Sequence, residues 1–338
     1  MLRVLHLAGS AVSAFFGDLS RLYAADCLAA TADPARYEFH VAWVTPDGCW
    51  RFPADLSDAA LAAAVPFSLP DALTRIVALD VDVVVPQMFC LPGMTTYRGL
   101  FDVLGIPYVG NPPSVMALGA DKAKAKAVVA AAGVAVPEGQ LLRPGEAVSL
   151  VPPAVVKPVD ADNSAGLTLV RDPAEYPDAL AAAFTHSSQV LVERYVELGR
   201  EVRCGVVERD GELVGLPLEE YAVDSASKPV RPHDDKISQD GDGLHLVAKD
   251  GARAWIVDPA DPLTPVVWEA AKAAHRALGC RDYSLFDFRI DPDGRPWFLE
   301  AGLYCSFART SVVATMAAAA GISLHELFAD MVERARTA

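Results

Sequence analysis

Several features are scarce or absent in this sequence, and each absence narrows the functions that it can have. The six cysteines lie far apart and none forms a C-x-x-C pair or a zinc-finger spacing, which predicts reduced thiols and neither a disulfide framework nor a structural zinc site. No stretch approaches the roughly 20 consecutive apolar residues of a membrane span, and the apolar run at the N-terminus is too short for a signal peptide. We therefore expect a cytoplasmic protein without a membrane partner.

Positive charge is also scarce. The chain has 29 Lys and Arg residues against 44 Asp and Glu residues, which gives a net charge of −15. A surface of this sign repels phosphate backbones and anionic lipids, so we expect no nucleic-acid partner. It is compatible with a ligand whose own negative charge is neutralised by a metal ion.

Apolar residues, by contrast, make up 52% of the 338 positions, which is ample for packed cores in two or three domains. Up to about residue 110, near-continuous apolar runs such as "LRVLHLAG" and "VDVVVPQ" alternate with segments of helical periodicity. Strands that alternate with helices in this way are typical of a parallel sheet covered by helices. We therefore predict an α/β fold with an N-terminal domain over residues 1–110.

The pattern changes beyond residue 110. The segment "DKAKAKAVVAAAG" predicts a helix that ends at Gly133. Residues 201–207 and 213–221 flank a glycine-containing turn at 209–212, which predicts an antiparallel hairpin. Residues 222–262 are polar and rich in Asp, Gly and Pro, so they predict a long mobile loop of the kind that often acts as a lid.

Two helix boundaries are predicted near the C-terminus. The segment "PLTPVVWEAAKAAHRALG" predicts a helix with Thr264 at its N-cap and Gly279 at its end. Ser323 and Glu326 have the spacing of a capping box, which predicts the start of a last helix.

The segment "FDFRIDPDGRPWFLEAG", residues 286–302, contains two carboxylates that call for an explanation. Two apolar strand-like runs flank a turn. Each run contains one acid that is not part of the turn, Asp287 in the first run and Glu300 in the second. If the turn has two residues, Asp287 lies opposite Phe298 and both acids point to one face of the hairpin. Like charges this close repel unless a cation lies between them, and carboxylate oxygens suit Mg²⁺ bound to phosphates. The alternative is a solvated strand face with two incidental acids.

Two lysines stand in settings that accord with this acid pair. "ALGADKAKAK" places Lys122 early in a helix, and "PAVVKPVDADNSAGLTLV" places Lys157 at a strand end before a small-residue loop, followed by "VLVERYVELGRE". In this order, the set resembles the ATP-grasp superfamily, and most closely the D-alanine–D-alanine ligase family. The resemblance covers most of the chain and is weakest over the first 100 residues and over 222–262.

The resemblance implies an ATP-grasp fold with three parts. A Rossmann-like N-terminal domain over residues 1–110 carries the substrate, and a central subdomain follows over 111–192. A C-terminal α+β subdomain over 193–338 carries the metal and the acceptor site. ATP would bind between two antiparallel sheets of the last two parts.

The resemblance also implies a role for each residue that matches a motif of the family. It assigns the ATP phosphates to Lys122 and Lys157, the adenine to Glu193 and Val196, the ribose hydroxyls to Glu201, the loop that closes over the phosphates to Ser164, the γ-phosphate to Lys236, and Mg²⁺ to Asp287 and Glu300. ATP and Mg²⁺ are therefore the implied cofactors. Taken alone, each charged residue could equally be a solvated surface charge, and the small-residue loop an ordinary turn.

Near the acid pair the sequence departs from the family. The family has an asparagine two residues after the second acid, which also binds metal, and here this position is Gly302. The family has an arginine two residues before the first acid, which stabilises the oxyanion of the tetrahedral intermediate, and here this position is Leu285. Arg289 and Arg309 are near in sequence, and each is a candidate to replace it.

The substrate regions depart further. Ser306 occupies a turn-glycine position, and Ser311 matches the serine that meets the second substrate. The family's glutamate for the ammonium of the first D-alanine has no clear counterpart in "GSAVSAFFGDLS", and "QMFCLPGMTTYRG" replaces a histidine-glycine stretch. These aromatic and apolar groups at predicted strand ends favour a substrate other than D-alanine, whose carboxylate would meet the guanidinium of Arg309. The alternative is that the aromatics are plain core and Arg309 is a surface charge.

We therefore predict an ATP-dependent carboxylate–amine ligase that works through an acyl phosphate on small amino-acid-like substrates. Two alternatives stay open. The altered first-substrate site also fits a ring closure in which acid and amine belong to one molecule. The losses at Leu285 and Gly302 also fit a nucleotide-binding module without turnover. A homodimer is compatible with the resemblance.

Overall fold

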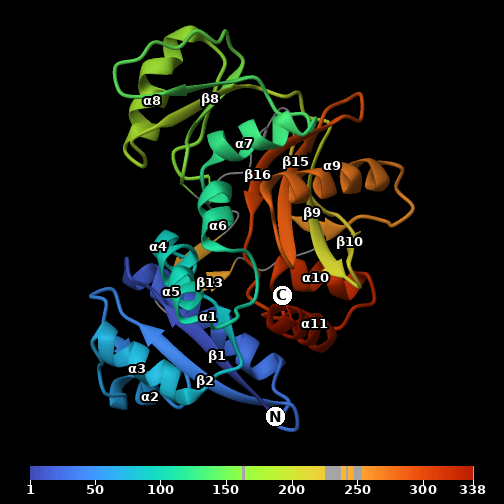
Figure 1. Ribbon diagram of the computed structural model, residues 1–338. Helices are drawn as coiled ribbons and strands as arrows, with labels where there is room; N and C mark the ends of the chain where they lie inside the picture. The colour runs from blue at the N-terminus through green and yellow to red at the C-terminus, as the bar shows by residue number, and fades with distance from the viewer. Residues whose placement is uncertain (162–163, 225–236, 241–242, 247–252, 338) are drawn as a thin grey trace.

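The computed structural model describes residues 1–161, 164–224, 237–240, 243–246 and 253–337. Figure 1 shows three bodies: an N-terminal body, a central body around α8 and β8, and a C-terminal body around β9 and β15, with α6 and α7 between them. Among the described residues, no single helix is long and apolar enough to cross a membrane, although α10 and α11 together pass that test as a pair bent by 113°.

The N-terminal body is the predicted helix-covered sheet. Its strand order is β3-β2-β1-β4; β1 pairs in parallel with β2 and with β4, and β3 adds an antiparallel edge. Its elements are β1 (Leu2–Gly9), α1 (Ala14–Ala30), β2 (Tyr37–Val44), β3 (Trp50–Arg51), α2 (Asp58–Ala63), α3 (Leu69–Leu79), β4 (Val83–Pro86), α4 (Leu91–Met94) and α5 (Thr96–Leu104). Gly9 ends β1 at φ +98°, and a Cβ there would lie 2.1 Å from the Val44 carbonyl oxygen, so this turn requires glycine.

The central body is a four-stranded antiparallel sheet in the order β5-β8-β6-β7. Its elements are β5 (Gly139–Leu142), β6 (Ala154–Pro158), β7 (Thr168–Val170), η1 (Pro173–Glu175), α8 (Tyr176–Phe184) and β8 (Val190–Arg194). The helices α6 (Pro113–Ala120) and α7 (Lys122–Ala131) precede it and pack in one core cluster with the C-terminal sheet. The predicted helix is α7, where the Asp121 carboxylate accepts a hydrogen bond from the Lys124 amide at 3.0 Å and caps the N-terminus. It ends at Ala131, two residues before the predicted stop, and Gly133 follows with φ +84°.

The C-terminal body holds the larger sheet, in the order β14-β11-β9-β15-β16, with β10 also paired to β9. Its elements are β9 (Arg200–Arg209), β10 (Glu212–Gly215), β11 (Glu219–Tyr221), β14 (Ala254–Ile256), α9 (Leu263–Leu278), β15 (Tyr283–Ile290), β16 (Pro296–Gly302), α10 (Val312–Ala319) and α11 (Leu324–Thr337). The hairpin predicted around residues 209–212 is confirmed as β9 and β10.

Alternation along β9 and β15 decides which face of this sheet is buried. Val202, Cys204, Phe286 and Phe288 are buried and pack in one core cluster with the apolar side of α9. The intervening residues therefore point to the other face, because successive side chains of a strand alternate. That face looks toward the central body.

Two sequence predictions need correction here. Residues 222–262 are not a plain loop, because β12 (Ile237–Asp240) pairs with β13 (Gly243–Leu246), and β14 joins the main sheet. The rest of that prediction lies partly outside the described residues. Thr264 is not the N-cap of α9, since the helix begins at Leu263, whose amide donates to the Asp261 carboxylate at 2.9 Å. The N-cap position is Pro262, which has no side-chain hydrogen bond to offer the helix, and Thr264 lies within the first turn.

The capping box at the last helix is confirmed. The Glu326 amide donates to the Ser323 hydroxyl at 3.2 Å, and the Ser323 amide donates to the Glu326 carboxylate at 2.8 Å. The helix that it starts, α11, does not stay with the C-terminal sheet alone. Phe328 on α11 packs in one buried cluster with Val4 and Val83 of the N-terminal sheet.

A polar joint links the N-terminal body to the C-terminal sheet near the predicted boundary at residue 110. The Asn111 side-chain amide donates to the carbonyl oxygens of Tyr283 and Leu303, both at 3.0 Å. The Gly110 amide donates to the buried Asp282 carboxylate at 2.7 Å. Since these groups are buried, each unmade hydrogen bond would be costly, so the joint holds the two bodies at a defined position.

Candidate active site

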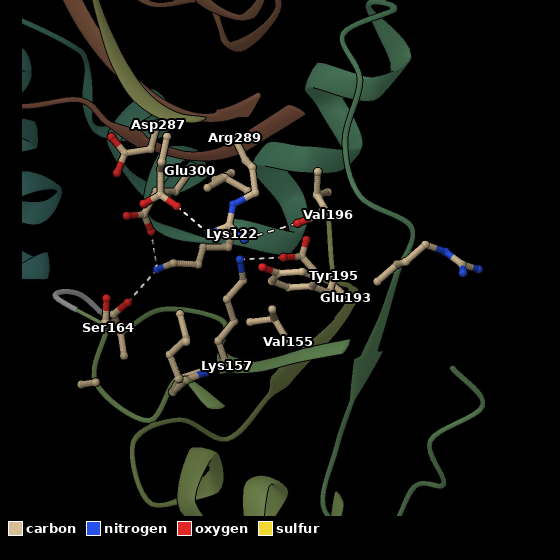
Figure 2. Close-up of a pocket in the computed structure, with 17 residues that line it drawn as sticks. Lys122, Val155, Lys157, Ser164, Glu193, Tyr195, Val196, Asp287, Arg289 and Glu300 are labelled. Carbon is tan, nitrogen blue, oxygen red and sulfur yellow. Dashed lines mark hydrogen bonds and ion pairs between the residues drawn. The ribbon is translucent and has the colours of Figure 1, made fainter. Parts of the chain in front are cut away.

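A cavity lies between the central sheet and the open face of the C-terminal sheet. Figure 2 shows Asp287, Glu300 and Arg289 reaching into it from one side and Lys157 and Val155 from the other. The predicted residues that line it are Lys122, Lys157, Ser164, Glu193, Val196, Glu201, Asp287, Arg289 and Glu300. They come from two sheets, one helix and the loops at Ser164 and Val196, which are distant in the sequence, and the fold brings them to one place.

Three buried charges meet at the floor of the cavity on the central sheet. The Glu193 carboxylate lies 2.6 Å from the Lys157 ammonium and also forms an ion pair with Lys126. Burial favours the neutral form of the carboxyl, but the two lysines outweigh it and hold the pKa of Glu193 below its ordinary value. Burial lowers the pKa of Lys126 to about 7, although Glu193 opposes this shift. Two ammonium groups on one carboxylate make this floor suited to an anion.

Lys126, the buried ion-pair partner of the cavity residue Glu193, was not predicted from the sequence. It follows Lys122 by four residues on α7, so the two side chains share one face of the helix. That spacing was visible in the sequence and could have identified it. Lys122 itself starts α7, is only 7% exposed, and donates to the Ala161 carbonyl oxygen at 2.6 Å. Its ammonium also lies 3.4 Å from the Glu300 carboxylate, which links the helix to the acid pair (Figure 2).

The two acids face the cavity together, but not by the predicted register. The loop between β15 and β16 is longer than two residues, because Ile290 pairs with Pro296 and Phe288 with Phe298. Compared with the predicted two-residue turn, this pairing is shifted by one residue, and the shift alone would send the acids to opposite faces. A bulge between Phe288 and Asp287 adds one residue on β16 and restores the parity, so Asp287 lies directly opposite Glu300.

Four charged residues form a row across four strands on this face. Glu219 on β11 is paired with Arg203 on β9, Arg203 with Asp287 on β15, and Asp287 with Glu300 on β16. The Arg203 guanidinium donates to both oxygens of Asp287, from Nε at 2.5 Å and from Nη2 at 3.2 Å. The sequence analysis did not single out Arg203 or Glu219. Arg203 stands two residues after Glu201, so strand alternation alone would have put both on one face.

The acid pair fits a magnesium ion held together with phosphates. Two carboxylates that face one cavity supply oxygen donors only, and Mg²⁺ usually takes one or two carboxylates while phosphates and water complete its shell. Among the described residues, no group of three or more His, Cys, Asp or Glu side chains could hold a metal ion by itself. The donor set is therefore suited to an ion that arrives with a nucleotide.

The far end of the cavity is organised by Arg289. Its guanidinium donates to the Glu201 carboxylate at 2.6 Å and to the Val196 carbonyl oxygen at 3.3 Å, and it lies 5.2 Å from the centre of the Tyr195 ring. The structure therefore places Arg289 among the residues that the resemblance assigns to adenine and ribose. Whether it also replaces the oxyanion arginine stays a prediction.

Three described candidates, Arg309, Ser306 and Ser311, do not line this cavity. Arg309 is exposed and bonds Asp26, with its amide donating at 2.6 Å and its Nε at 2.8 Å. Ser306 and Ser311 are buried, and the Ser311 hydroxyl lies 3.7 Å from the Cys305 sulfur. Lys236 lies outside the described residues. The roles predicted for these four residues stay predictions.

Comparisons with known proteins agree on one family. The family model described as the D-ala D-ala ligase C-terminus matches residues 140–333. A D-alanine–D-alanine ligase from Methylobacterium radiotolerans is 36% identical over 71% of this chain and 76% of its own length, and one from Nocardia farcinica is 32% identical over 96% of each.

Two solved structures share the fold. A D-Ala:D-Ser ligase from Enterococcus faecalis has a TM-score of 0.79 at 23% identity and covers 99% of each chain. A D-alanine–D-alanine ligase from Bacillus anthracis complexed with ATP has a TM-score of 0.71 at 21% identity and covers 100% of this chain and 99% of its own.

Proposed function

The chain belongs to the D-alanine–D-alanine ligase family of ATP-grasp enzymes, and from this premise we propose that it joins two small amino-acid-like substrates through an acyl phosphate. Membership of the family makes it an ATP-dependent ligase that forms a C–N bond, which sets aside a module without turnover. The observation that carries the proposal is that Lys122 of α7 and Lys157 of the central sheet line one cavity with Asp287 and Glu300 of the C-terminal sheet.

The proposed reaction has two steps that balance. A carboxylate oxygen of the first substrate attacks the γ-phosphorus of ATP, and ADP leaves with the electrons of the broken P–O bond. The amine of the second substrate then attacks the acyl carbon, phosphate leaves with the C–O electrons, and the amine loses a proton. Neither step needs a nucleophile from the protein, so positioning and charge neutralisation supply the rate.

Each part of the cavity has a role in this scheme. Lys122 and Lys157 bind phosphate oxygens as point charges, and the loop at Ser164 closes over them. Asp287 and Glu300 would hold Mg²⁺, which would neutralise the phosphate charge that otherwise repels the attacking carboxylate. The Glu201 carboxylate, held by Arg289 at 2.6 Å, accepts hydrogen bonds from the ribose.

We further propose that the first substrate carries an apolar or aromatic portion and is not D-alanine. Support comes from an aromatic cluster at the carboxyl end of β4, where Phe89 lies 5.4 Å from the ring of Tyr23 and 5.4 Å from that of Tyr304. Ligands of open parallel sheets gather at this edge. Tyr304 follows β16 by two residues, so the cluster is close in sequence to the acid pair.

D-alanine is the second candidate, because the curated relatives are named D-alanine–D-alanine ligases. Phosphate release from ATP, measured across D- and L-amino acids, dipeptides and ω-amino acids, decides between the two. We expect stimulation by substrates with larger apolar side chains, and product masses equal to two substrates less water. Stimulation by D-alanine alone would refute the substrate proposal, and a product mass of one substrate less water would indicate ring closure.

A further inference from the structure

The charged row Glu219–Arg203–Asp287–Glu300 places one cation among three carboxylates. Because each member is the direct register partner of the next, all four side chains lie on the same face of the sheet. Two of the acids, Asp287 and Glu300, line the cavity. Each of these two has a cation of the protein beside it: Arg203 for Asp287, and Lys122 at 3.4 Å for Glu300.

The guanidinium of Arg203 is built into the sheet and is permanently charged. An arginine side chain keeps its proton in proteins, so this positive charge is present whatever the neighbouring acids do. The fork reaches both oxygens of Asp287, and the guanidinium carbon lies 5.4 Å from the centre of the Tyr221 ring. A planar cation that is held by a carboxylate in a fork and by an aromatic ring keeps one orientation.

The next row along the same face supplies no side-chain donor. It consists of Gly205, Leu285 and Gly302, which are register partners across β9, β15 and β16. A Cβ at Gly205 would lie 3.1 Å from the sulfur of Met316, so this row is covered by α10. In this direction along the described parts of β9, β15 and β16, the charged oxygen donors of this face therefore end at the row that contains Arg203.

We infer that Arg203 is a positioning residue whose fixed positive charge lies beside Asp287. As a result, Asp287 and Glu300 bind a single divalent ion together with the nucleotide. This rests on the proposed function. A second divalent ion needs further oxygen ligands, and two-metal sites usually place their ions about 3.5–4 Å apart. Here both oxygens of Asp287 already accept from Arg203, and the guanidinium supplies the positive charge that a second ion would bring.

The test counts bound Mn²⁺ by electron paramagnetic resonance while Mn²⁺ is titrated into the full chain with saturating ADP. We expect the natural chain to bind a single tight Mn²⁺. Arg203→Gln should recruit a second Mn²⁺, because three carboxylates in one row are left without their central cation. Arg203→Lys, which keeps the charge, should still bind only one.

Arg209→Gln is the matched control. Arg209 lies on the same strand as Arg203 and pairs with Asp330 at 2.9 Å, but it does not line the cavity. This variant should bind a single Mn²⁺. Thermal unfolding of each variant shows whether it is folded. If Arg203→Gln does not fold, the number of Mn²⁺ ions bound by the natural chain and by Arg203→Lys tests the inference.

Two tight Mn²⁺ ions in the natural chain would overturn the inference and leave the ligase proposal intact. A single Mn²⁺ in folded Arg203→Gln would overturn it as well. Failure of the natural chain to bind either ADP or Mn²⁺ would instead remove the proposed function, and the inference with it.

Discussion

Two regions of the molecule differ in their chemistry: the cavity between the central and C-terminal sheets and the carboxyl edge of the N-terminal sheet. The cavity between the central and C-terminal sheets presents paired charges, in which Arg203 meets Asp287, Lys122 meets Glu300 and Arg289 meets Glu201. The carboxyl edge of the N-terminal sheet presents Tyr23, Phe89 and other apolar groups. Charged side chains gather in the cavity that we propose for ATP, whereas aromatic rings gather at the edge that we propose for the first substrate.

The sharpest way to break this comparison is to remove a charge from the acid pair. Asp287→Asn and Glu300→Gln should each lower kcat by at least about 100-fold, because an electrostatic contact aimed at developing charge is worth that much. Phosphate release measures the effect, and circular dichroism checks the fold. Asp293→Asn, an exposed acid in the loop of the same hairpin, is the matched control and should retain full activity. Near-native rates in both site variants would show that the acids are incidental.

Charge pairing should matter to stability as well as to activity. Lys126→Met leaves the buried Glu193 carboxylate with Lys157 as its cation, so we expect the free energy of unfolding to fall by about 2 kcal/mol, below the cost of losing every partner. Urea unfolding gives the value. Lys124→Met on the same helix removes an exposed lysine and should change it little. An equal effect of both substitutions would mean that burial of the cluster is unimportant.

The N-terminal sheet should respond to acid for a different reason, since it buries a neutral base. Burial lowers the pKa of His6 to about 3, and its Nδ1 lies 3.1 Å from the Gln87 side-chain nitrogen. Between pH 6.5 and about 3 the unfolded chain binds a proton there that the folded chain does not. Stability is therefore full above pH 6.5 and falls as the pH drops through this window.

His6→Asn should flatten this dependence of the unfolding free energy on pH. Stability curves measured from pH 7 down to pH 4 give the slope. His325→Asn, at an exposed position on α11, is the control and should leave the slope unchanged. A slope that His6→Asn does not alter would assign the acid sensitivity to other groups.

The apolar edge can be tested by changing its shape without its polarity. Phe89→Leu removes the ring between Tyr23 and Tyr304, and we expect KM for the preferred substrate to rise about 10-fold, since an aromatic contact and the lost area together are worth about 1–2 kcal/mol. KM for ATP should stay the same. A change in KM for ATP alone would place this cluster outside the substrate site.

The smallest effect is expected at Arg309, where sequence and structure point in different directions. The sequence predicts contact with a substrate carboxylate, whereas the structure pairs this exposed arginine with Asp26. We expect Arg309→Ala to lower the free energy of unfolding by less than about 1 kcal/mol, as exposed ion pairs do, with KM unchanged. A large rise in KM would restore the sequence prediction.

Much of this protein was determined by its sequence alone. Hydrophobic alternation and turn residues predicted the parallel N-terminal sheet, the hairpin at 209–212 and the capping box at Ser323, because these features depend on neighbours in the chain. The order of motifs around Lys122, Lys157 and the acid pair was sufficient to indicate the ATP-grasp fold. In these places the local chemistry of the chain and the final structure agree.

Only the tertiary structure decided the register and the partners. The sequence could not show that a longer loop and a bulge cancel to set Asp287 opposite Glu300. Nor could it show that Arg203, 84 positions away from Asp287, lies beside it. Strand pairing is set by packing between segments distant in the chain, and a one-residue slip reverses every side chain on a strand. For that reason the sequence revealed part of the charged set, Lys122, Lys157 and the two acids, and the fold determined that Arg203 and Lys126 join it.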